Sequence, residues 1–180
     1  MKRWALVFLT IVSGIAVSFA ADGEGFTFPV VKKYGGVATI PQAAEAPKKG
    51  VQAVFDITAT AEPESVNKGL ESVARYLNLN AQAGNLPSDV KLALVVHGGA
   101  TKVALGDAAY AKQTGAAKNP NLELIRELKS HGVEVFVCGQ SLARNKYAVA
   151  DVAGEFTIAA SAMTVNINKQ MAGYAYLSIH

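Results

Sequence analysis

The chain has 180 residues, of which 51% are hydrophobic and 17% charged, with 17 basic and 14 acidic side chains. A length of this order is typical of one domain, and the composition excludes an intrinsically disordered chain, a coiled coil and a basic nucleic-acid-binding tail. The single cysteine excludes an intramolecular disulfide framework.

Residues 1–20 have the pattern of a secretory signal peptide. Lys2 and Arg3 form a positive start, residues 4–17 form an apolar stretch too short to cross a bilayer, and residues 18–20 end in the small-residue pattern of a cleavage site. We therefore expect a periplasmic or secreted protein that is not held in the membrane after cleavage. Without the two basic residues of this segment the net charge is close to +1, which leaves no electrostatic footprint for nucleic acid.

Residues 21–50 are expected to form an irregular N-terminal arm. The segment contains three of the six prolines and shows neither helical nor strand periodicity. We expect it to pack on the domain through Phe26, Phe28, Val30 and Tyr34.

From residue 51 onward, short β-branched runs alternate with stretches of helical periodicity. The expected strands are 51–58, 90–96, 133–137, 155–160 and 174–179. The expected helices are 63–84, a weaker one at 101–112, 119–132, a short one ending near residue 147, and 162–173. Pro63 is expected in the first turn of its helix, and Asn119 and Pro120 as the N-cap and first residue of theirs. The alternation predicts one α/β domain over residues 51–180, with a mainly parallel sheet of about five strands and helices on both faces.

Ligands of such a sheet bind beyond the carboxyl ends of its strands, where polar residues such as Asp56, Thr58 and Ser161 are expected. Cys138 directly follows one strand and opens a helix, a position that lowers the pKa of a thiol and favours nucleophilic chemistry. His97 follows another strand and could orient or deprotonate a sulfur-bearing group if the two strands are neighbours. A buried structural cysteine and a turn histidine bonded to the backbone are the alternatives.

Four further residues are expected to contact a bound ligand at this edge: Gly98, Gly139, Gln140 and Ser141. Gly139 is expected to let another molecule approach the backbone closely. Residues 139–143 nearly match the serine nucleophile elbow, but the motif's last glycine is Ala143. The three histidines and one cysteine lack metal-ligand spacing, so we expect no metal site and no cofactor. His131 is expected to cap a helix, and nothing indicates a role for His180.

Three segments together resemble the DsrE/DsrF-like family, in particular its exported branch: VVHGGATKVAL (95–105), NPNLELIRELKSHGVEVFVCGQSLARNKY (119–147) and SAMTVNINKQMAGYAYL (161–177). The resemblance covers roughly residues 51–179, and GVEVFVCGQSL is its most specific part. It implies a three-layer α/β/α sandwich around a parallel sheet and assembly as a homotrimer or homohexamer. In sulfur-relay members a cysteine after a V-x-V-C strand end carries a persulfide, and Cys138 falls on that position.

The resemblance therefore implies an exported sulfur carrier or sulfurtransferase that acts through Cys138 without a cofactor. Its partner would be a sulfur donor or acceptor protein or a small sulfur compound. The alternative is a non-catalytic ligand-binding or assembly module that keeps the fold. A weaker alternative is a redox-linked dimer joined through Cys138.

Overall fold

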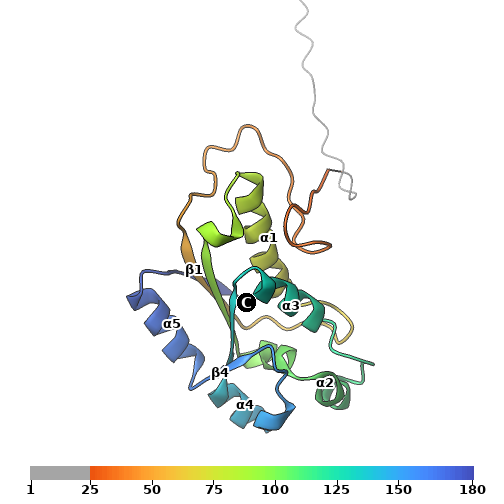
Figure 1. Cartoon of the computed structure of the whole chain (residues 1–180). Coiled ribbons are helices and arrows are strands. Elements are labelled where there is room, and N and C mark those ends of the chain that lie inside the picture. Colours follow the sequence, from red (N-terminus) through yellow and green to blue (C-terminus); the bar gives the residue numbers. More distant parts are fainter. Residues whose placement is uncertain (1–24) are drawn as a thin grey trace, which may run out of the picture.

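The computed structural model describes residues 25–180, so the predicted signal peptide and residues 21–24 of the arm lie outside the described residues (Figure 1). The strands are β1 (Gln52–Ile57), β2 (Lys91–Val96), β3 (Glu134–Cys138), β4 (Thr157–Ala159) and β5 (Ala175–Ile179). The α-helices are α1 (Lys68–Gln82), α2 (Asp107–Thr114), α3 (Leu122–Ser130), α4 (Gly139–Asn145) and α5 (Ala162–Met171). Short 3-10 helices are η1 (Pro87–Asp89), η2 (Gly98–Ala104) and η3 (Val149–Asp151).

The five strands form one sheet in the order β4-β3-β2-β1-β5, and every neighbouring pair is parallel. The predicted α/β class and the parallel sheet are confirmed. β1 and β2 are the best buried strands, with five of the six residues of each buried. β5 is an edge strand and is exposed along most of its length.

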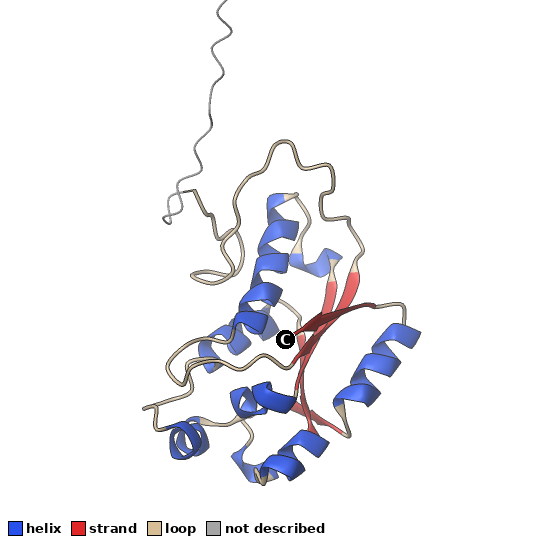
Figure 2. Ribbon diagram, turned by 180° about the vertical axis from the view of Figure 1, so that it is seen from behind, coloured by secondary structure: helices blue, strands red, loops and turns tan. Residues whose placement is uncertain are grey.

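The sheet separates two layers of helices, which Figure 2 shows from behind. Among the described residues, α1 and α3 cover one face and α5 is the helix that packs on the other. Alternate residues of each strand point to opposite faces, so the core is divided. The larger part lies under α1 and α3 and includes Phe55 and Leu94. The smaller part lies under α5 and includes Val54, Val95 and Cys138.

Two helix starts differ from the sequence predictions. α1 begins at Lys68 rather than at Pro63, because the Asn67 side chain caps it by accepting the Gly69 N–H at 2.8 Å. α3 begins at Leu122, after Asn121.

The Asn119 side chain has another function, which explains the later start of α3. Its amide donates to the buried carbonyls of Val103 and Leu105 at 2.8 and 2.7 Å, and its oxygen accepts the Asn121 N–H. The weak helix predicted at 101–112 is two pieces, η2 and α2, with Gly106 between them.

The arm is held mainly by one buried side chain of α1. Asn78 accepts the N–H groups of Val30 and Val31 at 2.9 Å and donates toward three carbonyls at residues 31, 34 and 35. Val31 is the fully buried anchor, with Val30 and Tyr34 packed beside the core. Phe26 and Phe28 are more exposed: they lie against the arm's own Gly36 and line a surface groove together with Glu71 and Arg75 of α1.

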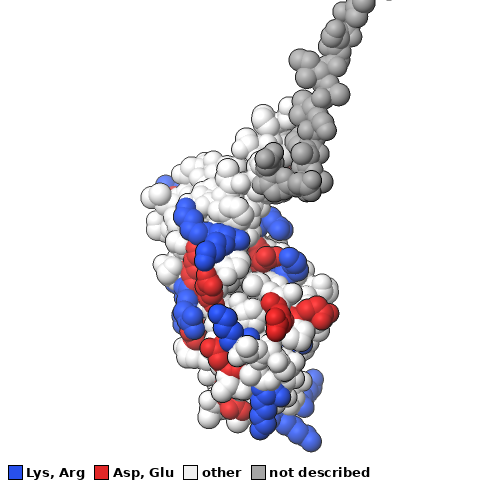
Figure 3. Space-filling view, turned by 90° about the vertical axis from the view of Figure 1, so that its right-hand side faces the viewer, with Lys and Arg blue, Asp and Glu red and all other residues white. Residues whose placement is uncertain are grey.

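The surface carries charges of both signs. On the face shown in Figure 3, basic and acidic side chains alternate. Among the described residues, no helix combines the length and apolar character needed to cross a bilayer.

Candidate functional site

The carboxyl ends of the three central strands bring Asp56, His97 and Cys138 to one side of the sheet. Asp56 lies two residues after Val54, and His97 two residues after Val95, so both share the face covered by α5. Cys138 belongs to the same α5-facing cluster. Because β2 pairs with β3, with Val96 opposite Val137, the next residues, His97 and Cys138, are neighbours. The predicted role of His97 required its strand to lie next to that of Cys138, and the two strands are neighbours.

Cys138 is almost enclosed, with 4% of its surface exposed. Burial raises the pKa of its thiol, but neighbouring donor groups outweigh this and leave the pKa below its ordinary value. These groups are the Ser141 hydroxyl and the backbone N–H groups of Ala162, Ser141 and Gln140. They belong to the starts of α4 and α5, so both helix starts favour a negative charge on the sulfur, although the Cys138 side chain makes no cap hydrogen bond to α4.

Ser141 connects the cysteine to the turn after β2. Its Oγ accepts the Gly98 N–H at 3.2 Å. With the oxygen used as an acceptor, the hydroxyl proton is free to point at the Cys138 sulfur. Gly98 has a φ of +55°, a left-handed conformation that glycine adopts without strain, and this directs its N–H toward Ser141.

His97 is paired with a buried carboxylate. Its Nε2 lies 2.7 Å from Oδ1 of Asp56, although the alignment is not that of a straight hydrogen bond. The contact with Asp56 raises the pKa of His97 despite partial burial, and the nearby Cys138 raises it further. Burial raises the pKa of Asp56, but His97, Tyr176 and Asn166 together hold it below its usual value. The pair therefore favours an ionised carboxylate and makes His97 a stronger base than a free imidazole.

Tyr176 and Asn166 are site residues that the sequence did not reveal. Tyr176, on the edge strand β5, donates its hydroxyl to Asp56 Oδ2 at 2.6 Å. Asn166, on α5, is 8% exposed, and its Oδ1 has no hydrogen-bond partner among the described residues. The row of polar side chains continues to His180, whose ring nitrogens lie 2.8 Å from Thr58 Oγ1 and 2.7 Å from Ser178 Oγ. In the sequence, neither the residue type nor the spacing of Tyr176 and Asn166 indicates that they contact Asp56.

The remaining predicted site residues divide into two groups. Gly98 and Ser141 are joined to Cys138, as described above. The Gln140 side chain is exposed and reaches toward the Ala160 carbonyl at 3.4 Å, while its backbone N–H helps to lower the pKa of Cys138. Gly139 is needed for packing inside the fold, because a Cβ there would lie 2.8 Å from the Ala159 carbonyl oxygen.

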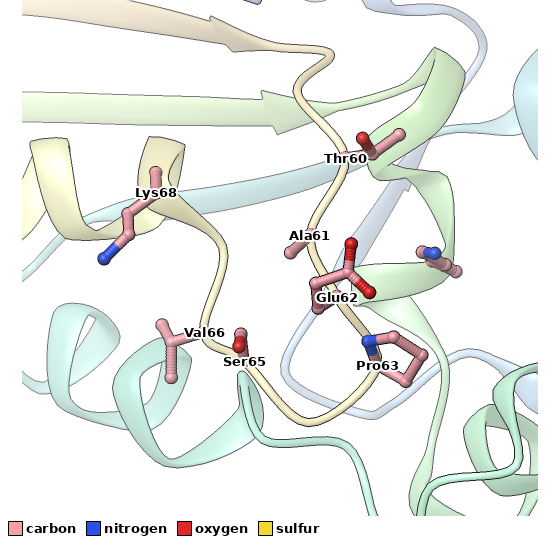
Figure 4. A pocket seen from close by; sticks show the side chains of 8 residues that line it. Thr60, Ala61, Glu62, Pro63, Ser65, Val66 and Lys68 are labelled. Carbon is pink, nitrogen blue, oxygen red and sulfur yellow. The ribbon is translucent and has the colours of Figure 1, made fainter.

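Two further observations concern cavities and metal sites. A surface cavity of about 600 Å³ lies between the loop after β1 and η2, and neither Cys138 nor His97 lines it (Figure 4). Its lining is Thr60, Ala61, Glu62, Pro63, Ser65, Val66, Lys68 and Lys102. Within residues 25–180, no group of three or more His, Cys, Asp or Glu side chains is arranged to hold a metal ion.

Comparisons with known proteins agree on the fold. The model of the DsrE/DsrF-like family matches residues 52–179. A protein of unknown function from Methanobacterium thermoautotrophicum, MTH1491, superposes with a TM-score of 0.52 at 19% identity, covering 72% of this chain and 99% of that one. The ychN protein from E. coli superposes with a TM-score of 0.51 at 13% identity and the same coverage. No curated protein sequence matches the chain.

Proposed function

The chain belongs to the DsrE/DsrF-like family, and from this premise we propose that it is an exported sulfur carrier or sulfurtransferase in which Cys138 accepts sulfane sulfur. One observation carries the proposal: Cys138 ends the buried strand β3 as the N-cap residue of α4, beside His97 at the end of the neighbouring strand β2. The Ser141 hydroxyl and N–H groups at the starts of α4 and α5 lower the pKa of its thiol. The same groups would stabilise the negative charge of a persulfide at this position.

The transfer needs no external oxidant or reductant. The Cys138 thiolate attacks the outer sulfur of a donor R–S–SH, a new S–S bond forms at Sγ, and the donor's S–S bond breaks. The electron pair of that bond leaves with R–S⁻. His97 takes the thiol proton of Cys138 before the attack and returns it to the leaving thiolate, so the products are Cys138–S–SH and R–SH.

The enclosure of Cys138 favours a small sulfur compound as the donor. Only 4% of the residue is exposed, while the neighbouring His97 side chain is 27% exposed. A polysulfide or a low-molecular-weight persulfide can approach along the imidazole. A protein-bound persulfide would need the start of α5 to move.

Sulfur loading can be tested by intact mass. The protein is incubated with inorganic polysulfide, and its mass is measured before and after treatment with a reductant. We expect the wild type to gain sulfur that the reductant removes, and Cys138→Ser, which lacks the only cysteine, to gain none. If the two proteins behave alike, the proposal is wrong.

A non-catalytic assembly module is the second candidate, and the outer side of α5 favours it. Met163, Ile167 and Met171 form an apolar stripe that is 72%, 55% and 83% exposed. Exposed stripes of this kind are typical of protein contacts. A native Cys138 that resists alkylation and has an unshifted thiol pKa would favour this candidate over the carrier.

We also propose that the protein forms a homo-oligomer, a trimer or hexamer by family analogy, with the α5 stripe at the contact. A charged substitution there, Ile167→Glu, would then dissociate it. Light scattering at micromolar concentration gives the mass, and a monomeric wild type would refute the assembly.

Export rests on the pattern of residues 1–20. We expect the expressed chain to appear in the periplasm or medium with a new N-terminus at Ala21, which N-terminal mass analysis would reveal. An unprocessed cytoplasmic product would refute export.

A further inference from the structure

Asp56, His97 and Cys138 stand on three adjacent strands in that order. β1 pairs with β2, with Ile57 opposite Val96, and β2 pairs with β3. His97 therefore lies between a carboxylate on one side and a thiol on the other. With Nε2 against Asp56, Nδ1 is the ring nitrogen left to exchange a proton with the thiol.

The carboxylate is itself fixed by two elements. Its Oδ1 faces His97, and its Oδ2 accepts the Tyr176 hydroxyl at 2.6 Å. β5 pairs with β1 so that Val54 lies opposite Tyr176, which places the phenol on the α5 side of the sheet. Asn166 approaches the same carboxylate from α5 and favours its charged form. Asp56 is 7% exposed, so water does little to weaken these contacts.

We infer that Asp56 is a positioning residue for His97, and that Tyr176 and Asn166 hold Asp56 in place for this purpose. The inference rests on the proposed sulfur-acceptor function of Cys138. A carboxylate at one ring nitrogen fixes the orientation of the imidazole and stabilises the imidazolium formed when Nδ1 takes the thiol proton. Asp56 stays ionised throughout, and the proton moves only between the sulfur atoms and His97.

The arrangement assigns a positioning role to the edge strand β5. Strands β1 to β3 supply the carboxylate, the imidazole and the thiol, and β5 supplies the phenol that aligns the carboxylate. The other titratable groups near the pair are Cys138 and, at the end of β5, His180. His180 bonds to Thr58 and Ser178, and its partners do not include Asp56.

The pH profile of Cys138 alkylation by iodoacetamide tests the inference. Three variants are compared with the wild type: Tyr176→Phe, Asp56→Asn and the control Tyr174→Phe. The Tyr174 hydroxyl contacts Glu134, at the start of β3 and away from the carboxyl edge. We expect Asp56→Asn to lower the alkylation rate at neutral pH roughly tenfold or more and to move the profile to higher pH. Tyr176→Phe should shift it in the same direction by a smaller factor, and Tyr174→Phe should leave it unchanged.

A double variant separates positioning from a general loss of structure. If Asp56 acts through His97, Asp56→Asn has no further effect on the profile in a His97→Gln background. Profiles of folded Asp56→Asn and Tyr176→Phe that coincide with the wild type would overturn the inference. Alkylation needs no sulfur donor, so this result is independent of sulfur loading. Failure of the wild type to gain sulfur would refute the proposed function instead.

Discussion

Ser141→Ala removes a hydroxyl that lowers the pKa of the Cys138 thiol. Ser141 is buried, and its Oγ accepts the Gly98 N–H at 3.2 Å, which leaves the hydroxyl proton free for the thiolate. A hydrogen bond to a charged group contributes about 1.5–3 kcal/mol. Since about 1.4 kcal/mol corresponds to a factor of ten, losing it lowers the thiolate population roughly ten- to hundredfold at a pH below the thiol's pKa. The fold should survive, because Gly98 is exposed and water can replace the lost partner of its N–H.

The assay is the rate of iodoacetamide alkylation across a pH series, supported by the ultraviolet absorbance of the thiolate. Ser130→Ala is the matched control, since Ser130 donates its hydroxyl to the Glu127 carbonyl at the end of α3. We expect a slower reaction and a higher thiol pKa for Ser141→Ala alone, with all three proteins showing the same far-ultraviolet circular dichroism. An alkylation profile of Ser141→Ala identical to that of the wild type would show that the hydroxyl does not stabilise the thiolate.

Three further outcomes follow from the packing and the charges. Gly139→Ala should lower the free energy of unfolding in urea by about 1–3 kcal/mol, because its Cβ would meet the Ala159 carbonyl at 2.8 Å; an unchanged midpoint would contradict this. Asn78→Ala should cost about 1–3 kcal/mol or more and make the arm the first site of tryptic cleavage, since five backbone contacts of the arm lose their partner. The lowered pKa of Asp56 stabilises the fold, and this stability is lost as the pH falls through that lowered pKa. The raised pKa of His97 also stabilises the fold: this contribution is complete below the ordinary histidine pKa and is lost as the pH rises through the raised pKa. Wild type should therefore exceed His97→Gln most in mildly acidic urea titrations, and a difference that is constant with pH would refute the pairing.

The alternation of strand-like and helix-like periodicity was sufficient to predict the α/β class and the parallel sheet. Five predicted strands match β1 to β5 because each is a short apolar run whose character depends on local pattern. The starts of α1 and α3 did not follow from the same pattern. α1 begins where the Asn67 side chain caps the Gly69 N–H, a local contact that places the start five residues after Pro63. α3 begins after Asn121 because the Asn119 side chain bonds to the Val103 and Leu105 carbonyls, which only the folded chain brings to it.

The sequence by itself determined that a cysteine and a histidine follow buried strands, and this identified Cys138 and His97 as candidates. Only the tertiary structure decided that β2 and β3 are neighbours, since strand order depends on how crossovers pack. It also brought Tyr176 to Asp56 across a parallel pairing of segments 120 residues apart, and enclosed the cysteine beneath α5. Residue types and local periods are properties of short segments, whereas the partners of a buried charge depend on which segments the folded core places side by side.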